Sequence, residues 1–558
     1  MKSKNILIYL LLILSAGISC LLLASPSVSS VMIFFALWLF LCFALSRADL
    51  LQRFSGSLLL AKGIGFLFSL SFAYTYRNRF CELTARFLPF VPLDSYLLLR
   101  RFIQLIAAGS FFFVTVSAAC LLDRFFRILM QLNWKELLQT LPRMIHLRSA
   151  VLGLANILCA ILLGTVLLTA VQLLPIRNIQ KNVQRSAVVF QTEGTYHSLF
   201  SWCQSQLDNF TDALILLTSS DDAPDTALNR AMYGYNGQID DLNPTERLAA
   251  HYIDGVEFTG HGSYARYWHG YQVILRPLLE IFDYQQIRIL NGAAQLFLCL
   301  TVCWLMYRKK KAAYAVPYFI GYLMMMPLAL ADSLQFSPCY YVYTIGCLVL
   351  LCCNDAQRKK CAGFLFLNLG LAIAYFDFLT YPIATCGVPL LVYIMLTQSA
   401  SFEEQIRQIV RCVFCWGIGY AGMWSSKWVL ATWITGTNVL QNAQVAVTRH
   451  TAPGYSGTHY TIISCIIQNI CTFIRTPVLF LFLIFLVCLL LRFYHTHPIS
   501  FQSGHLYGLI AFFPLIWYTI LINHSSIHYW FTNKACLVLL LAVGFTFAEN
   551  FEAPPKKL

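Results

Sequence analysis

Long uninterrupted runs of apolar residues recur along nearly the whole chain, separated by polar segments. Each run suits a helix that crosses a hydrocarbon core, which takes roughly 17 to 25 apolar residues. Strands of a membrane barrel would alternate apolar and polar residues, so the continuous runs predict helices. We expect about fourteen spans, over residues 6–24, 31–46, 57–74, 102–122, 150–173, 287–306, 313–331, 336–353, 361–376, 380–397, 410–432, 474–492, 507–522 and 534–549.

Two polar stretches are too long to be simple connections between spans. Residues 174–286 carry 13 of the 25 acidic residues but only seven Lys and Arg, and residues 433–473 are interrupted by Pro453 and Gly454. We therefore predict an all-α integral membrane protein with a large, mainly helical extracytoplasmic loop. It divides into the N-terminal spans with a cytoplasmic amphipathic segment, the membrane module that includes the loop, and the second outer loop with the C-terminal spans, at residues 1–149, 150–432 and 433–558.

Composition and charge agree with this assignment. Hydrophobic residues make up 58% of the chain and charged residues only 11%, whereas about a quarter of a soluble chain is charged. The net charge of +14 comes from basic residues that collect in short segments on the predicted inner side, so it marks topology and not nucleic-acid binding. We expect a multi-pass protein of a bacterial plasma membrane with both termini in the cytoplasm.

One segment does not follow this rule. Residues 75–101 are predicted outside, yet they hold five arginines, Arg77, Arg79, Arg86, Arg100 and Arg101. Either the first four spans are miscounted, or a basic interfacial element lies there.

Ionisable side chains within or beside spans are costly in lipid and usually have a function. Five of them come from separate spans but share the predicted outer depth: Asp332, Asp377, Lys427, His524 and His528. The two histidines are four residues apart, so a helix would present both rings on one face, to a metal, a phosphate or a proton. Interfacial histidines beside an aromatic belt are the alternative.

Lys427 and Asp377 each allow a structural and a functional reading. Lys427, between Trp424 and Trp428, either extends its amine to the membrane surface or binds a phosphate beside a stacked sugar. Asp377 either caps a helix or orients a hydroxyl or a metal.

The loop 174–286 offers candidate bases and a candidate phosphate ligand. Asp208 and Asp212 are four residues apart, and they, with Glu193, could take a proton from a hydroxyl acceptor; the alternative is a set of solvated acids. Arg266 and His269 lie among aromatic residues shortly before a span, which suits a phosphate and a sugar face or a plain interfacial anchor.

Several function classes are disfavoured. No Walker loop, GxSxG elbow, HExxH helix or dinucleotide fingerprint is visible in the sequence. Cys412 and Cys415 lie within a predicted span without a nearby histidine, so zinc is not indicated. No cofactor is assigned, and a requirement for a divalent cation stays open.

The chain resembles the GT-C class of membrane glycosyltransferases, including uncharacterised bacterial members, over most of its length but through loose motifs. The similar stretches are Asp208–Asp212, Tyr264–Gly270, Tyr375–Pro382, Trp424–Trp428 and Asn523–Phe531. The chain departs from that class in its four preceding spans and in a first outer turn, Ser25–Ser30, that has no carboxylate, so the identity of the base is open.

The resemblance implies transfer of a sugar from a polyprenyl-phosphate donor to an extracytoplasmic cell-envelope glycan or lipid, in polysaccharide assembly. Asp212, Asp208 or Glu193 would be the base. Arg266, Lys427, His524 and His528 would hold the lipid phosphate, with His269 and Asp377 also facing substrate. A transporter or flippase of lipid-linked sugars is the alternative, and a non-catalytic assembly subunit is a third.

Overall fold

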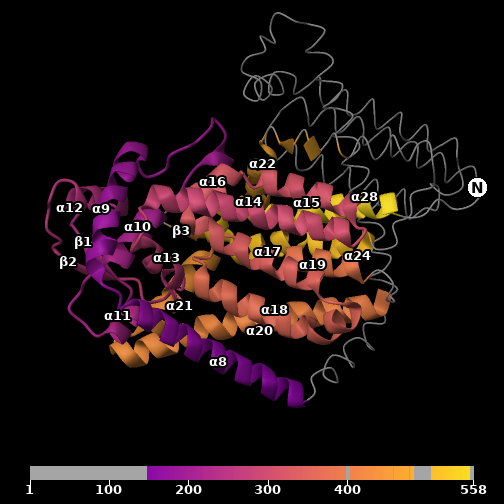
Figure 1. Cartoon of the computed structure of the whole chain (residues 1–558), viewed down its shortest axis with the longest axis horizontal. Helices are drawn as coiled ribbons and strands as arrows, with labels where there is room; N and C mark the ends of the chain where they lie inside the picture. Colours follow the sequence, from indigo (N-terminus) through magenta and orange to yellow (C-terminus); the bar gives the residue numbers. More distant parts are fainter. Residues whose placement is uncertain are drawn as a thin grey trace, which may run out of the picture. The chain divides into compact units, whose positions relative to one another are not determined.

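The computed structural model describes residues 147–397, 402–455, 458–476 and 504–552, with a few positions between 478 and 485. Outside them lie the four predicted spans before residue 147, the segment 75–101, nearly all of the predicted N-terminal region and most of the span 474–492. Within the described residues the chain is mainly α-helical, as the apolar runs predict, and the named strands form two short two-stranded sheets (Figure 1).

Five segments of the described residues are long and apolar enough to cross a bilayer, judged by length and composition. They are Ala150–Val171 in α8 (Leu147–Val171), α14 (Tyr284–Arg308), Leu334–Cys352 in η4 (Leu334–Phe336) and α17 (Ser337–Cys352), α18 (Asp355–Phe376), and Tyr529–Glu549 in α27 (Tyr529–Thr532), η5 (Asn533–Cys536) and α28 (Leu537–Glu552).

Shorter apolar helices occupy other predicted spans. They are α15 (Ala312–Met324), α19 (Ala384–Leu396), and Leu506–Ile520 in α24 (Gly504–Ala511) and α25 (Phe513–Ile520). A further short apolar helix, α22 (Ile462–Ile474), lies instead in the stretch 433–473 that the sequence predicted to be outside the membrane. The predicted span 313–331 is divided because Met326 adopts a left-handed conformation (φ 56°) and separates α15 from α16 (Pro327–Asp332). The predicted span 410–432 lies within the longer helix α20 (Phe402–Thr435).

Residues 174–286 fold into short helices and one two-stranded antiparallel sheet, in which Tyr235 pairs with Ser263 and helix α12 lies between the two strands in sequence. Capping boxes at Asn243 and Asp283 begin α12 and α14. The elements in chain order are α9 (Ile176–Glu193), η3 (Cys203–Ser205), α10 (Asn209–Ser220), α11 (Ala227–Tyr233), β1 (Tyr235–Gln238), α12 (Pro244–Tyr252), β2 (Gly260–Ser263) and α13 (Gln272–Leu279).

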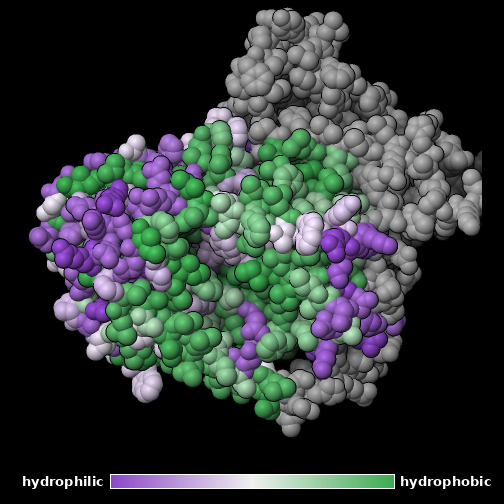
Figure 2. All heavy atoms as spheres, viewed as in Figure 1, coloured by the Kyte–Doolittle hydropathy of each residue, from purple (hydrophilic) through white to green (hydrophobic). Residues whose placement is uncertain are grey.

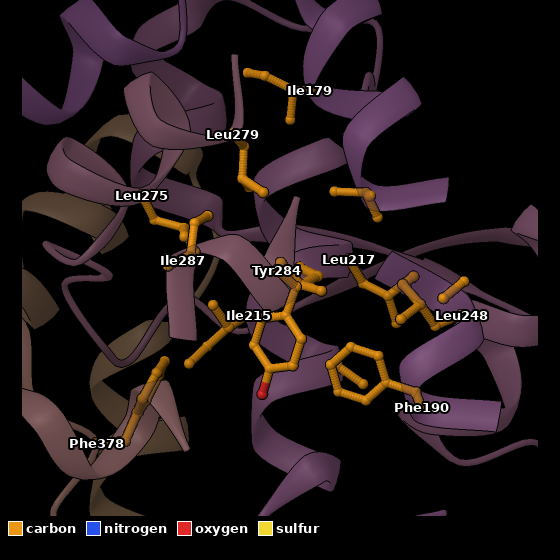
Figure 3. Packing of buried hydrophobic residues seen from close by; sticks show 14 of the residues in the cluster. Ile179, Phe190, Ile215, Leu217, Leu248, Leu275, Leu279, Tyr284, Ile287 and Phe378 are labelled. Atoms are coloured by element: carbon orange, nitrogen blue, oxygen red, sulfur yellow. The ribbon is translucent and has the colours of Figure 1, made fainter. Parts of the chain in front are cut away.

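One hydrophobic core joins this loop to the start of α14. Along α9 the buried residues Ile179, Val183 and Phe190 recur every three to four positions or multiples of that spacing, which makes one apolar face. That face meets residues of α10, α12 and α13 (Figure 3). Phe190 stacks on Tyr284 of α14, with ring centroids 4.8 Å apart, so the loop and the helix share a core.

Glycines bring α18 and α20 into close contact, and the two helices lie side by side in Figure 1. A Cβ added at Gly370 would lie 2.1 Å from the Trp416 carbonyl oxygen, and one at Gly419 would lie 2.2 Å from the Leu367 carbonyl oxygen. Small residues of this kind allow helix backbones to approach closely in membrane proteins. Elsewhere α17 packs on α19, and α15 and α24 pack on α28.

The stretch after α20 completes the described fold. It contains α21 (Val439–Thr451), the strands β3 (Gly454–Tyr455) and β4 (Thr458–His459), and, after α25, the short helix α26 (Ile522–Ile527). Helix α21 packs against α20 and α26. Figure 2 shows hydrophilic side chains gathered over α9, α12 and the β1–β2 sheet, whereas hydrophobic side chains cover most of the long helices beyond them.

Candidate active site

A partly buried ion pair joins the end of α9 to the first turns of α14. Glu193 accepts hydrogen bonds from Arg288, Oε1 from Nη1 at 2.6 Å and Oε2 from Nη2 at 2.9 Å, and from Asn209 Nδ2 at 2.9 Å. Arg288 also lies over the Tyr284 ring and donates to the Asp332 carbonyl at 2.8 Å. Burial alone would raise the pKa of Glu193, but the hydrogen bonds and charge of Arg288 hold it below its usual value. Both oxygens of the Glu193 carboxylate are therefore occupied by Arg288.

Asp212 is fully buried and uses both carboxylate oxygens to hold neighbouring segments. Oδ2 accepts from the Tyr284 hydroxyl at 2.5 Å and the Leu334 amide at 2.7 Å, and Oδ1 accepts from the Gln335 amide at 3.0 Å. Burial raises the pKa of Asp212 to about 6 against the effect of these hydrogen bonds. Asp212 therefore ties α10 to α14 and η4.

The carboxylate of Asp208 accepts fewer hydrogen bonds than those of the other two acids. It is the N-cap of α10, where Oδ1 accepts from the Thr211 amide at 3.1 Å. The side chain is 3% exposed, and burial, together with the nearby charge of Asp212, raises its pKa to about 7. A carboxyl that changes its charge near neutral pH is suited to general base catalysis. Of the three predicted acids, Asp208 has the geometry that fits this role best.

An aromatic bridge, Tyr196, Phe210 and Trp530, leads from Asp208 to the histidines. The Tyr196 ring lies 6.5 Å from that of Phe210 and 5.5 Å from that of Trp530, and Trp530 lies 5.2 Å from His528. Burial raises the pKa of Tyr196, and the charge of Asp208 adds to the shift, so the phenol and the carboxylate are close. Aromatic faces next to a carboxylate suit a sugar ring.

Three histidines, His450, His524 and His528, form one cluster. The ring of His524 lies 4.8 Å from that of His450 and 4.9 Å from that of His528. The i, i+4 spacing does bring the last two together, although the helix breaks at His528, between α26 and α27. Burial lowers the pKa of His524 well below its usual range and that of His528 to about 4. The cluster is therefore neutral at physiological pH.

The positive charge next to this cluster comes from arginines. The Arg266 guanidinium lies 4.6 Å from the centroid of the Tyr264 ring and 5.2 Å from that of Tyr267, and Nη1 donates to Asn442 Oδ1 of α21 at 3.4 Å. Burial lowers the pKa of His450 to about 4, and the charges of Arg266 and Arg449 act in the same direction, which places both cations close to His450.

Two predicted substrate ligands hold local structure. His269 is 2% exposed, and its ring Nε2 lies 2.8 Å from the Tyr264 carbonyl oxygen. Burial lowers its pKa to about 3. Lys427 is fully buried, and its Nζ donates to the carbonyls of Ala231 at 3.2 Å and Met232 at 2.9 Å, near the end of α11. Neither side chain faces open space in this arrangement.

Asp377 organises the turn between α18 and α19. It accepts hydrogen bonds from the Thr380 amide at 2.8 Å and from the Thr380 hydroxyl, and burial raises its pKa to about 6. Within this turn Leu379 has a φ of 71°, and its carbonyl oxygen lies 2.8 Å from His524 Nε2. The carboxylate of Asp377 therefore holds a turn and does not cap the helix α19, which begins at Ala384, and this turn reaches His524.

The structure connects the five stretches on which the resemblance rests. Tyr264–Gly270 touches Tyr375–Pro382 through a hydrogen bond from the Gly270 amide to the Tyr375 carbonyl at 2.9 Å. It touches Trp424–Trp428 through Trp428 Nε1, which donates to the Arg266 carbonyl at 3.0 Å. The Leu379–His524 contact adds Asn523–Phe531, and the aromatic bridge adds Asp208–Asp212. Side chains far apart in sequence therefore belong to one connected region.

Sequence reasoning missed several members of this region. Arg288 lies inside a predicted span, so the rule that flagged the other ionisable residues would also have found it. No sequence pattern marks Tyr196, Trp530 or His450 as neighbours of the acids or of the other histidines, because only folding brings them together.

Among the described residues of the chain, no group of three or more His, Cys, Asp and Glu side chains is arranged to hold a metal ion. Comparison of the chain with protein-family models, with curated proteins and with solved structures finds no match. The functional argument therefore depends on the chemistry of the site itself.

Proposed function

We propose that the chain is a multi-pass plasma membrane protein with about fourteen spans and the loop 174–286 on the extracytoplasmic side. The apolar surface of α8 supports this proposal. Only 11% of its most apolar window is buried, and Leu158 and Leu162 are 58% and 66% exposed. Soluble monomers rarely expose apolar patches of this extent.

For its activity, we propose transfer of a sugar from a polyprenyl-phosphate donor to a cell-envelope acceptor. The acceptor oxygen forms a bond to the anomeric carbon, the bond from that carbon to the phosphate oxygen breaks, and Asp208 takes the hydroxyl proton. The cations of Arg266 and Arg449 stabilise the phosphate that leaves. Tyr196 and Trp530 offer faces to the sugar ring.

One observation supports this reaction above all. Asp208 is a buried carboxyl with little hydrogen bonding, and the aromatic bridge leads from it to a neutral histidine cluster flanked by arginines. Glycosyl transfer requires a general base, a surface on which the sugar ring can stack, and cations that bind the phosphate. The resemblance to GT-C glycosyltransferases supports the same reaction.

A transfer assay in nanodiscs tests the proposal. The wild-type protein receives labelled polyprenyl-phosphate sugars and a cell-envelope acceptor extract, and released polyprenyl phosphate is measured. We expect turnover that Asp208→Asn lowers at least about 100-fold, the range of a general base contribution. Asp222→Asn is the matched control, because Asp222 is an exposed acid of the same loop, and it should keep wild-type turnover.

Two outcomes would contradict the proposal. Full turnover in Asp208→Asn would remove this residue as the base. Saturable donor binding without turnover over a broad panel of sugars would replace the enzyme with a transporter or flippase of lipid-linked sugars.

A further inference from the structure

The contact between His524 and Leu379 determines which ring nitrogen of His524 carries the hydrogen. Nε2 lies 2.8 Å from the Leu379 carbonyl oxygen. A carbonyl oxygen only accepts hydrogen bonds, so Nε2 must be the N–H donor, and in the neutral ring Nδ1 is then a lone-pair acceptor. Nδ1 is buried and has no hydrogen-bond partner, and the side chain is only 5% exposed.

Asp377 and the turn that follows it orient the Leu379 carbonyl towards His524. The carboxylate of Asp377 accepts from both the amide and the hydroxyl of Thr380. Leu379, one residue earlier, has a φ of 71°, a conformation that residues other than glycine seldom adopt and that persists only where the surroundings impose it. The turn therefore keeps Leu379 in an unfavourable backbone conformation, and in this conformation the Leu379 carbonyl contacts His524.

The unpaired nitrogen of His524 belongs to a larger unpaired polar group. His528 Nδ1 and Trp530 Nε1 are also buried without hydrogen-bond partners. Their rings are 5.2 Å apart, and the His528 ring is 4.9 Å from the His524 ring. An indole N–H only donates, whereas Nδ1 of His524 only accepts. The group therefore needs a ligand that can both donate and accept.

This requirement separates two ligand chemistries. The oxygens of a fully ionised phosphate accept hydrogen bonds but have none to donate, so they would leave Nδ1 of His524 unpaired. A hydroxyl group does both, and a neutral sugar presents several hydroxyls beside an apolar ring face that suits Trp530. Buried polar groups that stay unpaired are costly, so a site of this kind discriminates strongly.

We propose that the histidine cluster recognises hydroxyl groups of a neutral sugar, with His524 Nδ1 as an obligatory acceptor and Asp377 as a positioning residue that acts through the Leu379 carbonyl. The identification of this sugar as the substrate rests on the proposed glycosyl transfer. The hydroxyl-binding chemistry itself does not, and it replaces the phosphate-binding role that the sequence suggested for His524.

Nitrogen NMR of the full-length protein in nanodiscs, labelled with ¹⁵N-histidine and assigned with His524→Gln, tests the tautomer. We expect a neutral His524 ring with its hydrogen on Nε2. Asp377→Asn should produce a mixture of tautomers, because one amide cannot replace both acceptor oxygens, whereas Asp222→Asn should leave the signals unchanged. A hydrogen on Nδ1, or a charged ring, in the wild-type protein would overturn the proposal. An unchanged tautomer in Asp377→Asn would remove the positioning role.

Binding of two probes tests the ligand class. Octyl β-glucoside, below its micelle concentration, presents neutral hydroxyls, and farnesyl phosphate presents an anion on a prenyl chain. We expect octyl β-glucoside to shift the His524 Nδ1 signal and farnesyl phosphate to leave it unchanged. A shift with farnesyl phosphate alone would return the cluster to phosphate binding and overturn the proposal.

Two amide substitutions of different length separate the ring nitrogens. His524→Asn keeps an acceptor near the place of Nδ1, whereas His524→Gln keeps a donor near the place of Nε2 but removes the acceptor. We expect octyl β-glucoside to bind at least tenfold more weakly to the Gln variant than to the Asn variant, and the reverse order would contradict the acceptor role. If sugar binding follows this order but the transfer assay shows no turnover, the hydroxyl site is supported and the enzyme proposal fails.

Discussion

Residues of one type differ in role because their surroundings differ. Glu193 is bound by Arg288, Asp212 gives both oxygens to three donors, and Asp208 accepts at its carboxylate from the Thr211 amide that it caps. The three acids share one region, but their environments separate structural carboxylates from the candidate base.

Asp212→Asn should therefore act first on stability. The amide cannot accept all three hydrogen bonds, so at least one buried donor among Tyr284, Leu334 and Gln335 loses its partner. An unsatisfied buried group costs about 1–3 kcal/mol. We expect a lower midpoint of thermal unfolding in detergent, with Asp222→Asn unchanged as the control. A wild-type midpoint combined with lost transfer would restore Asp212 as the base.

The raised pKa of Asp208 predicts a pH-dependent difference between wild type and Asp208→Asn. A folded-state pKa of about 7, against about 3.9 in an unfolded chain, means that the folded state holds the extra proton between these values. Asp208 therefore contributes less stability as pH rises from about 4 to about 7. Relative to wild type, Asp208→Asn should gain stability over this range.

Thermal unfolding of both proteins across this pH range measures the effect. The buried histidines have lowered pKa values, so their contribution to stability grows as pH rises. They are present in both proteins, and their effect cancels in the difference. The same shift predicts that transfer by the wild type rises as pH increases through about 7, because the base must be ionised. A difference that is flat with pH would show that Asp208 keeps an ordinary pKa.

At the scale of elements, the pairing of α18 with α20 depends on glycines that have no other evident purpose. Gly370→Ala would place a methyl group 2.1 Å from the Trp416 carbonyl oxygen, and the backbones would have to separate. Overpacking of this kind costs about 1–3 kcal/mol. We expect a lower unfolding midpoint for Gly370→Ala in nanodiscs.

The matched control for this prediction is Gly417→Ala in α20. Nothing lies within 4 Å of a Cβ added at Gly417, and alanine favours a helix more than glycine does. The control should unfold at the wild-type temperature or slightly above it. Equal losses in both variants would contradict the prediction, because they would show that the close contact of α18 with α20 at Gly370 does not set the difference in stability.

Sequence reasoning predicts elements better than it predicts contacts. Continuous apolar runs predicted the helices α8, α14, α17, α18 and α28, because burial in an apolar medium acts on every residue of a run. Sequence reasoning did not predict that Met326 would separate α15 from α16, because this break depends on the backbone conformation of one residue. The role of Lys427 at the end of α11 was also missed, since the two segments are about two hundred residues apart and only folding joins them.

At the scale of the whole molecule, the proposed function requires one particular side of the membrane. The acids and the histidine cluster must face the compartment of the acceptor. The basic residues Arg358 and Lys360 at the start of α18 must then lie in the cytoplasm, as the distribution of charge predicts. The apolar exposure of α8 supports insertion but does not choose between the two orientations, because length and hydropathy are the same in both.

Two single cysteine substitutions decide the orientation. Ser263 in β2 and Lys360 in α18 are both exposed, so either cysteine should react with a maleimide that reaches it. In intact cells, a membrane-impermeant maleimide should label Ser263→Cys, whereas Lys360→Cys should react only after permeabilisation, with peptide mass spectrometry to separate these sites from the native cysteines. The opposite pattern would place Asp208 and the histidine cluster in the cytoplasm. An acceptor in the cell envelope could then not reach the base, and the proposed reaction would have to be abandoned whatever the mutants show in detergent.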